Sequence, residues 1–262
     1  MRLVTWNINS LNARQARVEA LLGELQPDIC CLQETKIADR SFPAMAFEAL
    51  GYESAHHGNG RWNGVAILSR VGLSEARAGF VDDEADSIEE CRLLQANCGG
   101  TRVMCVYVPN GRSVDSEHYA AKLTWLARLR DELGRTCDPT TPLVVCGDFN
   151  IAPGDDDVFD PAAFVGATHV TPQERAALGD LLAWGLVDAQ RHVVPCGPGP
   201  FTWWDYRAGA FHKGEGMRID LALCSRPVAE RLIEVRVERE ARKKGTFDVA
   251  PSDHAPLVLD WQ

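Results

Sequence analysis

The stretch that most constrains this chain is a short uncharged run, residues 142–146, followed by Gly147, Asp148 and Asn150. The run is rich in β-branched and apolar residues, as expected of a strand buried on both faces of a sheet. Gly147 lets the backbone turn or approach a ligand closely, and Asp148 and Asn150 then share one side of an extended chain. Ligands bind at the carboxyl ends of central strands in layered α/β proteins, so the stretch suits a functional site. A plain Asx turn after a strand is the commoner origin of such a motif, so other polar stretches must support the site.

The composition is that of an ordinary globular protein. With 262 residues, 45% hydrophobic and 24% charged, the chain can bury a large core, and no linker or repeat divides it, so we expect one domain spanning residues 1–262. The apolar runs are too short to cross a bilayer, so we expect no membrane association and a cytoplasmic location. A net charge of -10 argues against broad attraction to nucleic acid, but it permits a local basic face and favours divalent cations.

The nine cysteines are an odd number and show no paired Cys-x-x-Cys spacing. Several lie within apolar, strand-like runs, namely Cys30, Cys31, Cys105, Cys146 and Cys224. Buried free thiols in a reducing compartment explain this pattern better than a disulfide framework or a zinc site does.

Two expected strands near the N-terminus end in polar residues. Residues 2–8 form a strand pattern that ends at Asn7 and Asn9, and residues 28–33 form a second one that ends at Glu34. A helical stripe of apolar residues separates them, so we expect parallel strands with Asn7 and Glu34 close together. Two amides and a carboxylate form the hard-oxygen environment that Mg²⁺ prefers, but a solvated Glu34 in a loop explains this residue equally well.

The rest of the chain alternates between predicted strands and helices. We expect strands at residues 52–57, 64–69, 92–97, 101–108, 218–224 and 257–261, and helices at 115–133 and 171–184. Residues 155–157, three aspartates in a row, predict a solvated acidic turn. Trp62 stands between Arg61 and Asn63 in a glycine-rich loop, where it is suited to stack against nucleic acid; a half-exposed structural Trp is the alternative.

One predicted buried strand carries a carboxylate in its interior. Asp220 lies within the apolar run 218–224, and a charge in such a place needs a partner. We expect that partner in residues 252–256, which include Asp253 and His254 and precede the last strand. Each of these polar groups alone has a structural explanation, but their repeated placement at strand ends favours a site.

Polar residues expected at or beside strand ends are Asn7, Glu34, Tyr107, Asp148, Asn150, Asp220, Asp253 and His254. They include four carboxylates and one histidine but no reactive serine or cysteine, which suits metal-assisted attack of water on a phosphodiester. In this scheme Glu34 holds Mg²⁺, Asp148 takes a proton from the water and Asn150 orients it. His254, held by a buried carboxylate, donates to a phosphate oxygen, and Tyr107 assists from another side.

Short motifs in the same order resemble those of the exonuclease III family of apurinic/apyrimidinic endonucleases. They occupy residues 6–9, 32–36, 107–111, 147–150, 204–207, 218–220 and 252–256, which together span nearly the whole chain. The resemblance implies a four-layered α/β sandwich, in which two mixed β-sheets pack face to face and are flanked by helices, as in deoxyribonuclease I. It also implies Mg²⁺-dependent DNA repair, with Mn²⁺ as a substitute: incision at abasic sites, removal of blocks from 3′ ends, and 3′→5′ exonuclease action. The implied partner is double-stranded DNA with abasic sites, nicks or 3′ blocks, bound by a monomer.

The same resemblance implies roles for individual residues. The implied metal ligands are Glu34, which is the main one, and Asn7, Asn9 and Asp253. Asp220 is implied to orient His254. The implied walls of a pocket for the flipped abasic sugar are Trp203, Met217 and Ile219. The residues matched to DNA-contacting loops are Arg61, Trp62, Asn63, Arg112, Tyr206 and Arg207.

Two positions depart from the family pattern. Asn9 stands where some relatives have an acidic residue, so one ligand charge is absent and we expect weaker metal binding. His169 aligns with a position expected to be Gly or Ser in efficient abasic endonucleases, and an imidazole there would obstruct internal incision while a frayed 3′ end stays accessible. The alternative function is therefore specialised 3′-end processing. A same-fold hydrolase of RNA or phosphoinositides and a non-catalytic DNA-binding protein are more remote alternatives.

Overall fold

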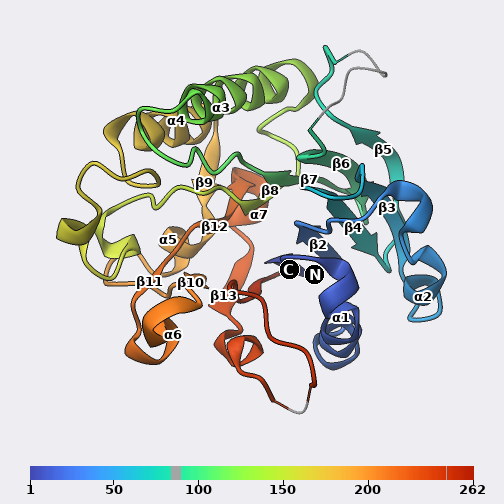
Figure 1. The fold of residues 1–262 in the computed structure, drawn as a ribbon. Coiled ribbons are helices and arrows are strands. Elements are labelled where there is room, and N and C mark those ends of the chain that lie inside the picture. The colour runs from blue at the N-terminus through green and yellow to red at the C-terminus, as the bar shows by residue number, and fades with distance from the viewer. Residues whose placement is uncertain (84–89, 246) are drawn as a thin grey trace.

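The computed structural model describes residues 1–83, 90–245 and 247–262. Within these residues the strands form two six-stranded sheets and a two-stranded ribbon. The two large sheets stack face to face, and helices cover their outer faces (Figure 1). The predicted four-layered α/β sandwich with mixed sheets is therefore confirmed.

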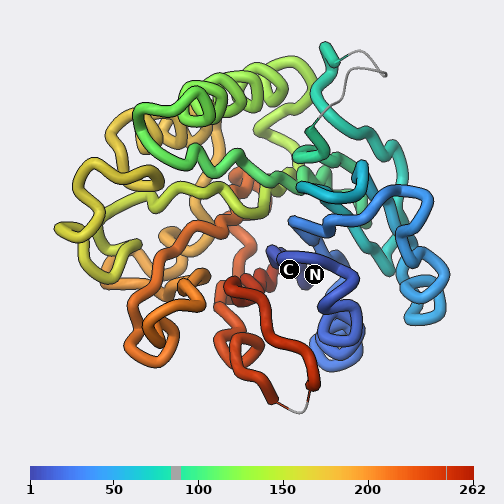
Figure 2. Tube along the Cα trace, in the orientation of Figure 1, coloured from blue at the N-terminus to red at the C-terminus, as the bar shows by residue number. Residues whose placement is uncertain are grey.

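The first sheet is built around the two ends of the chain. In spatial order it contains β13 (Leu232–Val237), β14 (Leu257–Trp261), β1 (Arg2–Asn7), β2 (Ile29–Gln33), β4 (Val65–Ser69) and β3 (Glu53–His57). The pair β1 and β2 is parallel, as predicted, and the other neighbours are antiparallel. Because β1 pairs with β14, the two termini lie side by side (Figure 2).

The second sheet carries the central strand predicted from residues 142–146. In spatial order it contains β5 (Ser74–Ala78), β6 (Leu93–Cys98), β7 (Thr101–Tyr107), β8 (Leu143–Asp148), β12 (Asp220–Ser225) and β9 (Leu186–Asp188). Strands β7 and β8 are parallel, while β12 runs antiparallel to β8. The ribbon consists of β10 (Trp203–Trp204) and β11 (Gly216–Met217).

The described residues contain the helices α1 (Leu11–Leu25), α2 (Ala44–Glu48), α3 (Glu117–Thr136), α4 (Pro172–Ala183), α5 (Ala189–Val193), α6 (Ala210–Lys213) and α7 (Arg226–Ala229). The outer layers are formed mainly by α1, α3 and α4, whereas α5 and α7 contribute residues to the apolar core between the sheets. An apolar cluster joins α1 to the first sheet, and another joins α3 and α4 to the second. The predicted capping box at Thr171 and Glu174 begins α4. No helix within the described residues combines the length and apolar character needed to cross a membrane.

Side-chain alternation directs the polar strand ends into the space between the sheets. Along β8, Val144 and Cys146 face the other sheet while Leu143 and Val145 face the helices, so Asp148 continues the row that faces the other sheet. The same alternation along β1 and β12 places Asn7 and Asp220 in that space. Because side chains alternate between the two faces of each strand, the polar residues at the ends of several strands lie in the same space between the sheets.

The predicted thiols lie in the apolar core of the protein, four of them between the sheets and Cys30 between the first sheet and α1. Cys30, Cys31, Cys105, Cys146 and Cys224 are buried, and all nine cysteines are free. Burial raises the pKa of the buried thiol Cys31 well above its ordinary value, so this side chain packs as a neutral apolar group. The prediction of buried free thiols is confirmed.

Sequence analysis missed the two short ribbon strands, β10 and β11, and three edge strands of the large sheets. The edge strands are β5, β9 and β13, whose residues are mostly half-buried or exposed. An edge strand has no uniform apolar face, so the hydrophobic pattern that identifies central strands is absent. The central strands were predicted because both their faces are buried.

Gly147 is required by strand packing. Its φ is +145°, and a Cβ at this position would lie 1.9 Å from the carbonyl oxygen of Val106 on the neighbouring β7. The close neighbour is therefore the protein's own backbone, which explains a glycine directly before Asp148.

We expect Gly147→Ala to lower the free energy of unfolding by about 3 kcal/mol, because the methyl group overlaps rigid backbone in a central strand. Denaturant unfolding measures the change. The matched control is Gly179→Ala in α4, where a Cβ meets no atom within 4 Å; it should stabilise the protein by about 0.5–1 kcal/mol. Equal stability of Gly147→Ala and wild type would contradict this account of β8.

Candidate active site

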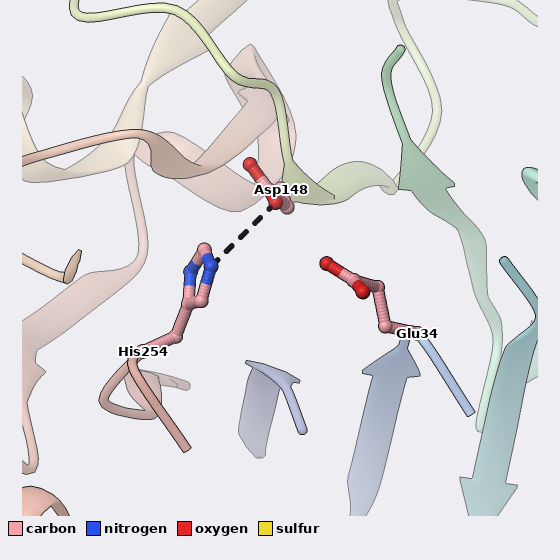
Figure 3. A group of neighbouring side chains, drawn as sticks. All are labelled: Glu34, Asp148 and His254. Atoms are coloured by element: carbon pink, nitrogen blue, oxygen red, sulfur yellow. Dashed lines mark ion pairs between the residues drawn. The ribbon is translucent and has the colours of Figure 1, made fainter. Parts of the chain in front are cut away.

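Polar side chains from both sheets converge at one edge of the sandwich. Glu34 follows β2, Asp148 ends β8, and His254 precedes β14; all three point toward one another (Figure 3). One ligand atom from each lies within 4.8 Å of the others. Residues far apart in sequence thus form one group of two carboxylates and an imidazole.

The amide of Asn7 links the two carboxylates of this group. Its Nδ2 donates to Glu34 Oε1 at 2.8 Å and to Asp148 Oδ2 at 2.9 Å. Asn7 and Asp148 belong to different sheets, so this contact also fixes how the sheet ends meet. The predicted closeness of Asn7 and Glu34 is confirmed.

His254 lies between two buried carboxylates. Its Nδ1 is 2.8 Å from Asp220 Oδ2, and its Nε2 is 3.8 Å from Asp148 Oδ2. Burial alone would lower the pKa of His254, but Asp220 and Asp148 raise it to about 10, so the ring is charged at neutral pH. The expected partner of Asp220 is therefore His254.

The protonation of Asp148 lies close to neutral pH. Burial raises its pKa to about 7, although the charged His254 opposes the rise. Its Oδ1 accepts the backbone N–H of Asn150 at 2.9 Å, which leaves Oδ2 to face Asn7 and His254. The Asx turn considered from sequence is thus present, and the same carboxylate also belongs to the site.

Glu34 stays ionised because of a lysine two residues later. Lys36 Nζ lies 2.8 Å from Glu34 Oε2 and 2.6 Å from Asn9 Oδ1. Burial would raise the pKa of Glu34, but the ammonium of Lys36 lowers it below its ordinary value. Lys36 was not predicted as a site residue, although it lies within the motif 32–36.

Asn9 and Asp253 extend the site on the side of Glu34. Asn9 Nδ2 donates to Asp253 Oδ1 at 3.1 Å, and Trp203 Nε1 donates to Asp253 Oδ2 at 3.1 Å. Burial would raise the pKa of Asp253, but the charge of His254 lowers it below its ordinary value. The structure therefore brings the predicted metal ligands together.

The donor set suits a hard divalent cation. Glu34 and Asp148 offer carboxylate oxygens within 4.8 Å of each other, and Mg²⁺ prefers such ligands. The Asn9 amide oxygen, which accepts from Lys36, and the Asp253 carboxylate, which accepts from Asn9, lie next to them. His254 is protonated and has no free lone pair for a metal. Asn7 turns its nitrogen rather than its oxygen toward the two carboxylates, so ligation by Asn7 stays a prediction.

Tyr107 borders the same group at the end of β7, opposite Asp148 in the strand register. The guanidinium carbon of Arg92 lies 4.6 Å from its ring centroid. Burial, together with the charges of Glu34 and Asp148, raises the pKa of Tyr107 well above its ordinary value. The hydroxyl of Tyr107 therefore stays protonated at neutral pH and can donate a hydrogen bond.

Asn150 occupies a left-handed backbone conformation with φ of 51°. Its Nδ2 donates to the carbonyl of Val108 at 3.0 Å, and its Oδ1 accepts from Asn110 Nδ2 at 3.0 Å. The side chain thus joins the Asp148 turn to residues 108–110. Its predicted contact with the attacking water stays a prediction.

The predicted apolar pocket walls form one cluster. Trp203 and Met217 pair across the ribbon, and Met217 and Ile219 are buried together with Ala152 and Val158. Trp203 also forms a bridge with His254, which places the cluster next to the charged group. The trio is assembled as predicted, and its use as a sugar pocket stays a prediction.

The six predicted DNA-contacting residues fall into two groups. In the first group, Trp62, Asn63 and Arg112 line a groove of about 610 Å³ together with Tyr107, and Arg61 lies next to Trp62. Trp62 is 65% exposed, and its ring centroid lies 5.6 Å from the guanidinium carbon of Arg61. This group therefore flanks Tyr107 and presents an aromatic face to solvent.

The second group lies beside the Asp253 loop. Tyr206 is half-exposed, its hydroxyl donates to the carbonyl of Pro251 at 2.8 Å, and Arg14 Nη2 donates to it at 3.2 Å. Arg207 follows it on the surface. DNA contact by either group stays a prediction.

His169 lies against the Asp148 turn. Its Nδ1 is 2.6 Å from the carbonyl oxygen of Asn150; because a carbonyl only accepts, Nδ1 carries the proton. Burial and the charge of Lys122 lower the pKa of His169 to about 4, so the ring is neutral at neutral pH. Its φ of 80° lies in the left-handed region that favours glycine. Its effect on substrate choice stays a prediction.

The prediction of a solvated acidic turn is wrong for Asp157. Asp157 is buried, and Arg218 Nε donates to its Oδ1 at 2.7 Å; Arg191 also pairs with it, and Arg218 reaches Asp188. Arg218 lies between the pocket residues Met217 and Ile219, so this network anchors the apolar cluster. Sequence gives no sign that one aspartate of three is buried.

Comparison with known proteins gives consistent matches. The sequence profile of the Endonuclease/Exonuclease/phosphatase family matches residues 4–254. The exodeoxyribonuclease III of Haemophilus influenzae is 35% identical over 271 residues, covering 100% of both chains. An AP endonuclease structure from Archaeoglobus fulgidus has a TM-score of 0.93 and 36% identity, covering 100% of this chain and 99% of that one. A 3′ phosphatase structure from Neisseria, bound to a product DNA hairpin, has a TM-score of 0.91 and 38% identity, with the same coverage.

We expect Asp220→Asn to destabilise the protein by about 3–5 kcal/mol near neutral pH, because it removes the carboxylate that stabilises charged His254. A histidine whose folded pKa is raised contributes stability below its ordinary pKa of 6.5, and this contribution is lost as pH rises through about 10. The loss should therefore be large at about pH 6 and small at about pH 10.

Denaturant unfolding of the metal-free protein at both pH values measures this loss. Asp131→Asn, on the exposed face of α3, is the control and should change little at either pH. An equal loss for Asp220→Asn at the two pH values would exclude the charged pair.

Proposed function

The chain belongs to the exonuclease III group of the endonuclease/exonuclease/phosphatase family, and from this we propose that it is a divalent-metal-dependent phosphodiesterase acting on double-stranded DNA at abasic sites and 3′ ends. The observation that carries the proposal is the convergence of Glu34, Asp148 and charged His254 within 4.8 Å. The names of the relatives, an exodeoxyribonuclease, an AP endonuclease and a 3′ phosphatase, support DNA as the substrate.

Asp148 is the proposed general base. Its pKa of about 7 lets it accept a proton from water near neutral pH, where a carboxylate of ordinary pKa is a weak base. Asn150 keeps Asp148 Oδ1 occupied through its backbone N–H, so Oδ2 is the oxygen available for the water proton.

His254 and Tyr107 are the proposed donors to the phosphate. His254 is charged and is held by Asp220, so its Nε2–H can stabilise the negative charge that grows on a phosphate oxygen. Tyr107 remains protonated because of burial and the neighbouring carboxylates, so it can donate from the side of β7. The two donors are fixed before the substrate binds, which avoids reorganisation during the reaction.

Glu34, with Asp253 and the Asn9 oxygen near it, would hold the divalent cation. When bound, the cation supplies charge neutralisation and Lewis-acid polarisation of the phosphate. Lys36 lies between Glu34 and Asn9, where its ammonium balances the carboxylate charge. Mg²⁺ is the cation we propose, with Mn²⁺ as a substitute.

The apolar cluster and the two outer groups complete the substrate site. Trp203, Met217 and Ile219 form a small buried wall next to His254, which suits a flipped sugar that lacks its base. Trp62 and Arg112 on one side and Arg207 on the other offer stacking and phosphate contacts. These contacts are local, in keeping with a chain of net charge -10.

A second candidate function is 3′-end processing with weak abasic incision, and His169 motivates it. The imidazole contacts the carbonyl of Asn150, so its bulk lies against the turn that carries Asp148. The AP endonuclease and the 3′ phosphatase are similarly related to this chain, at 36% and 38% identity, so relatedness does not choose between the two functions. The side chain at position 169 is therefore the feature to test.

We expect Mg²⁺-dependent cleavage of a nicked duplex that ends in a 3′-phosphate, and loss of about 10²–10⁴ in rate for Asp148→Asn, because the general base is removed. A duplex with an internal abasic site is assayed in parallel, and a chelator should stop all cleavage. The control is Asp180→Asn on the exposed surface of α4, which should retain full activity. Preferential hydrolysis of RNA or a phosphoinositide would reject DNA as the substrate.

We expect His169→Gly to raise abasic incision by about tenfold or more, equivalent to about 1.4 kcal/mol of barrier, with little change in 3′-phosphate release. Glycine suits the φ of 80°, so the variant should fold. His169→Gln retains the bulk and should keep the low incision rate. If His169→Gly changes neither activity, the second candidate function is wrong.

A further inference from the structure

A buried ion pair lies beneath the candidate active site and is not part of it. Lys122 on α3 and Glu174 on α4 are each 0% exposed, and Lys122 Nζ pairs with Glu174 Oε1. Burying two charges is costly, and apolar residues of similar volume often hold helices together at least as well. The charges therefore call for an explanation beyond the packing of α3 against α4.

The ammonium of Lys122 connects two loops of the site. Nζ donates to the carbonyl oxygen of Asn150 at 2.7 Å and reaches that of Asn110 at 3.4 Å. Asn150 follows Asp148, and Asn110 precedes the groove residue Arg112. The buried amine of Lys122 thus holds both the turn that follows Asp148, the proposed base, and the loop that leads to Arg112, a proposed DNA contact.

Glu174 holds Lys122 and a third loop. Its Oε1 accepts from the Thr168 hydroxyl at 2.7 Å and from the His169 backbone N–H at 3.0 Å. Its Oε2 accepts from the backbone and the hydroxyl of Thr171 at 3.1 and 2.8 Å. The carboxylate is fully satisfied, so it forms a rigid anchor for the amine.

The carbonyl of Asn150 is the point where these contacts meet. It accepts from Lys122 Nζ and from His169 Nδ1, while Asn150 itself keeps a left-handed φ of 51°. Asparagine adopts this conformation more readily than most residues other than glycine, and here the two hydrogen bonds to its carbonyl hold it in place. The N–H of the same residue donates to Asp148 Oδ1, so the turn sets the orientation of the carboxylate.

We propose that Lys122 is a positioning residue for the hydrolysis, which holds the Asn150 carbonyl and thereby the orientation of Asp148. The kinetic test of this inference rests on the proposed function, because it measures hydrolysis of DNA. Glu174 supports Lys122 but has no contact of its own with Asn150 among the described interactions, so the two members of the pair have separable roles.

The test compares Lys122→Met, Glu174→Gln and the double variant Lys122→Met/Glu174→Gln. Each variant removes the ion pair, but Glu174→Gln retains an amine that donates to the Asn150 carbonyl. The double variant leaves no unpaired buried charge, so it should fold better than Lys122→Met alone. Comparing the double variant with Glu174→Gln therefore isolates the contact between Lys122 and Asn150 from the stability of the pair.

We expect the double variant to lose about 10- to 100-fold in kcat on the 3′-phosphate duplex, with KM nearly unchanged, because a small misplacement of Asp148 slows the chemical step. Glu174→Gln should lose less kcat than the double variant, because its Lys122 amine can still donate to the Asn150 carbonyl. If the two variants lose kcat equally, or if the double variant regains both stability and kcat, Lys122 has only a structural role and the proposal is overturned.

Hydrogen exchange of the Asn150 amide provides a readout that does not depend on activity. It should be faster in the double variant than in Glu174→Gln, because the turn that protects this N–H is released. Unchanged protection would overturn the proposal. A wild-type protein that cleaves no DNA would instead contradict the proposed function, and the exchange rate would still decide whether Lys122 holds the turn.

Discussion

The hydrogen bonds of the Asn7 amide connect the two sheets at the point where the candidate site is built. Asn7 ends a strand of the first sheet, and Nδ2 reaches Asp148 of the second sheet at 2.9 Å and Glu34 at 2.8 Å. Alternation along β1 and β8 directs both side chains into the space between the sheets. A one-residue slip in either strand would turn its polar end toward the helices. The site thus depends on the register of each sheet and on how the sheets stack.

Burial has opposite outcomes for the two carboxylates that share Asn7. It raises the pKa of Asp148 to about 7, whereas at Glu34 the ammonium of Lys36 outweighs burial and keeps the pKa below its ordinary value. His254 becomes the charged partner because Asp220 and Asp148 outweigh its own burial. Under the proposed mechanism this divides the roles: Glu34 stays ionised, Asp148 exchanges a proton, and His254 donates.

Sequence analysis predicted the central strands and the polar residues at their ends because both signals are local. A buried strand is a short apolar run, and a carboxylate directly after it stands out, as Glu34 and Asp148 do. The same reasoning failed for charges that are buried by contacts distant in sequence. Asp157 looks like an exposed turn residue until Arg218 is placed beside it, and the partners Lys122 and Glu174 are 52 residues apart. An ion pair between residues far apart in the sequence produces no repeating pattern from which it could be predicted.

The sequence by itself determined the alternation of strands and helices, the polar ends of the strands and the candidate set of site residues, because apolar periodicity and turn chemistry act over a few neighbours. Only the tertiary structure decided which of these residues meet. It paired His254 with Asp220, placed Lys36 against Glu34, and set His169 and Lys122 on one carbonyl. The physical reason is that burial and charge pairing, which set protonation and orientation, arise only when distant segments exclude water together.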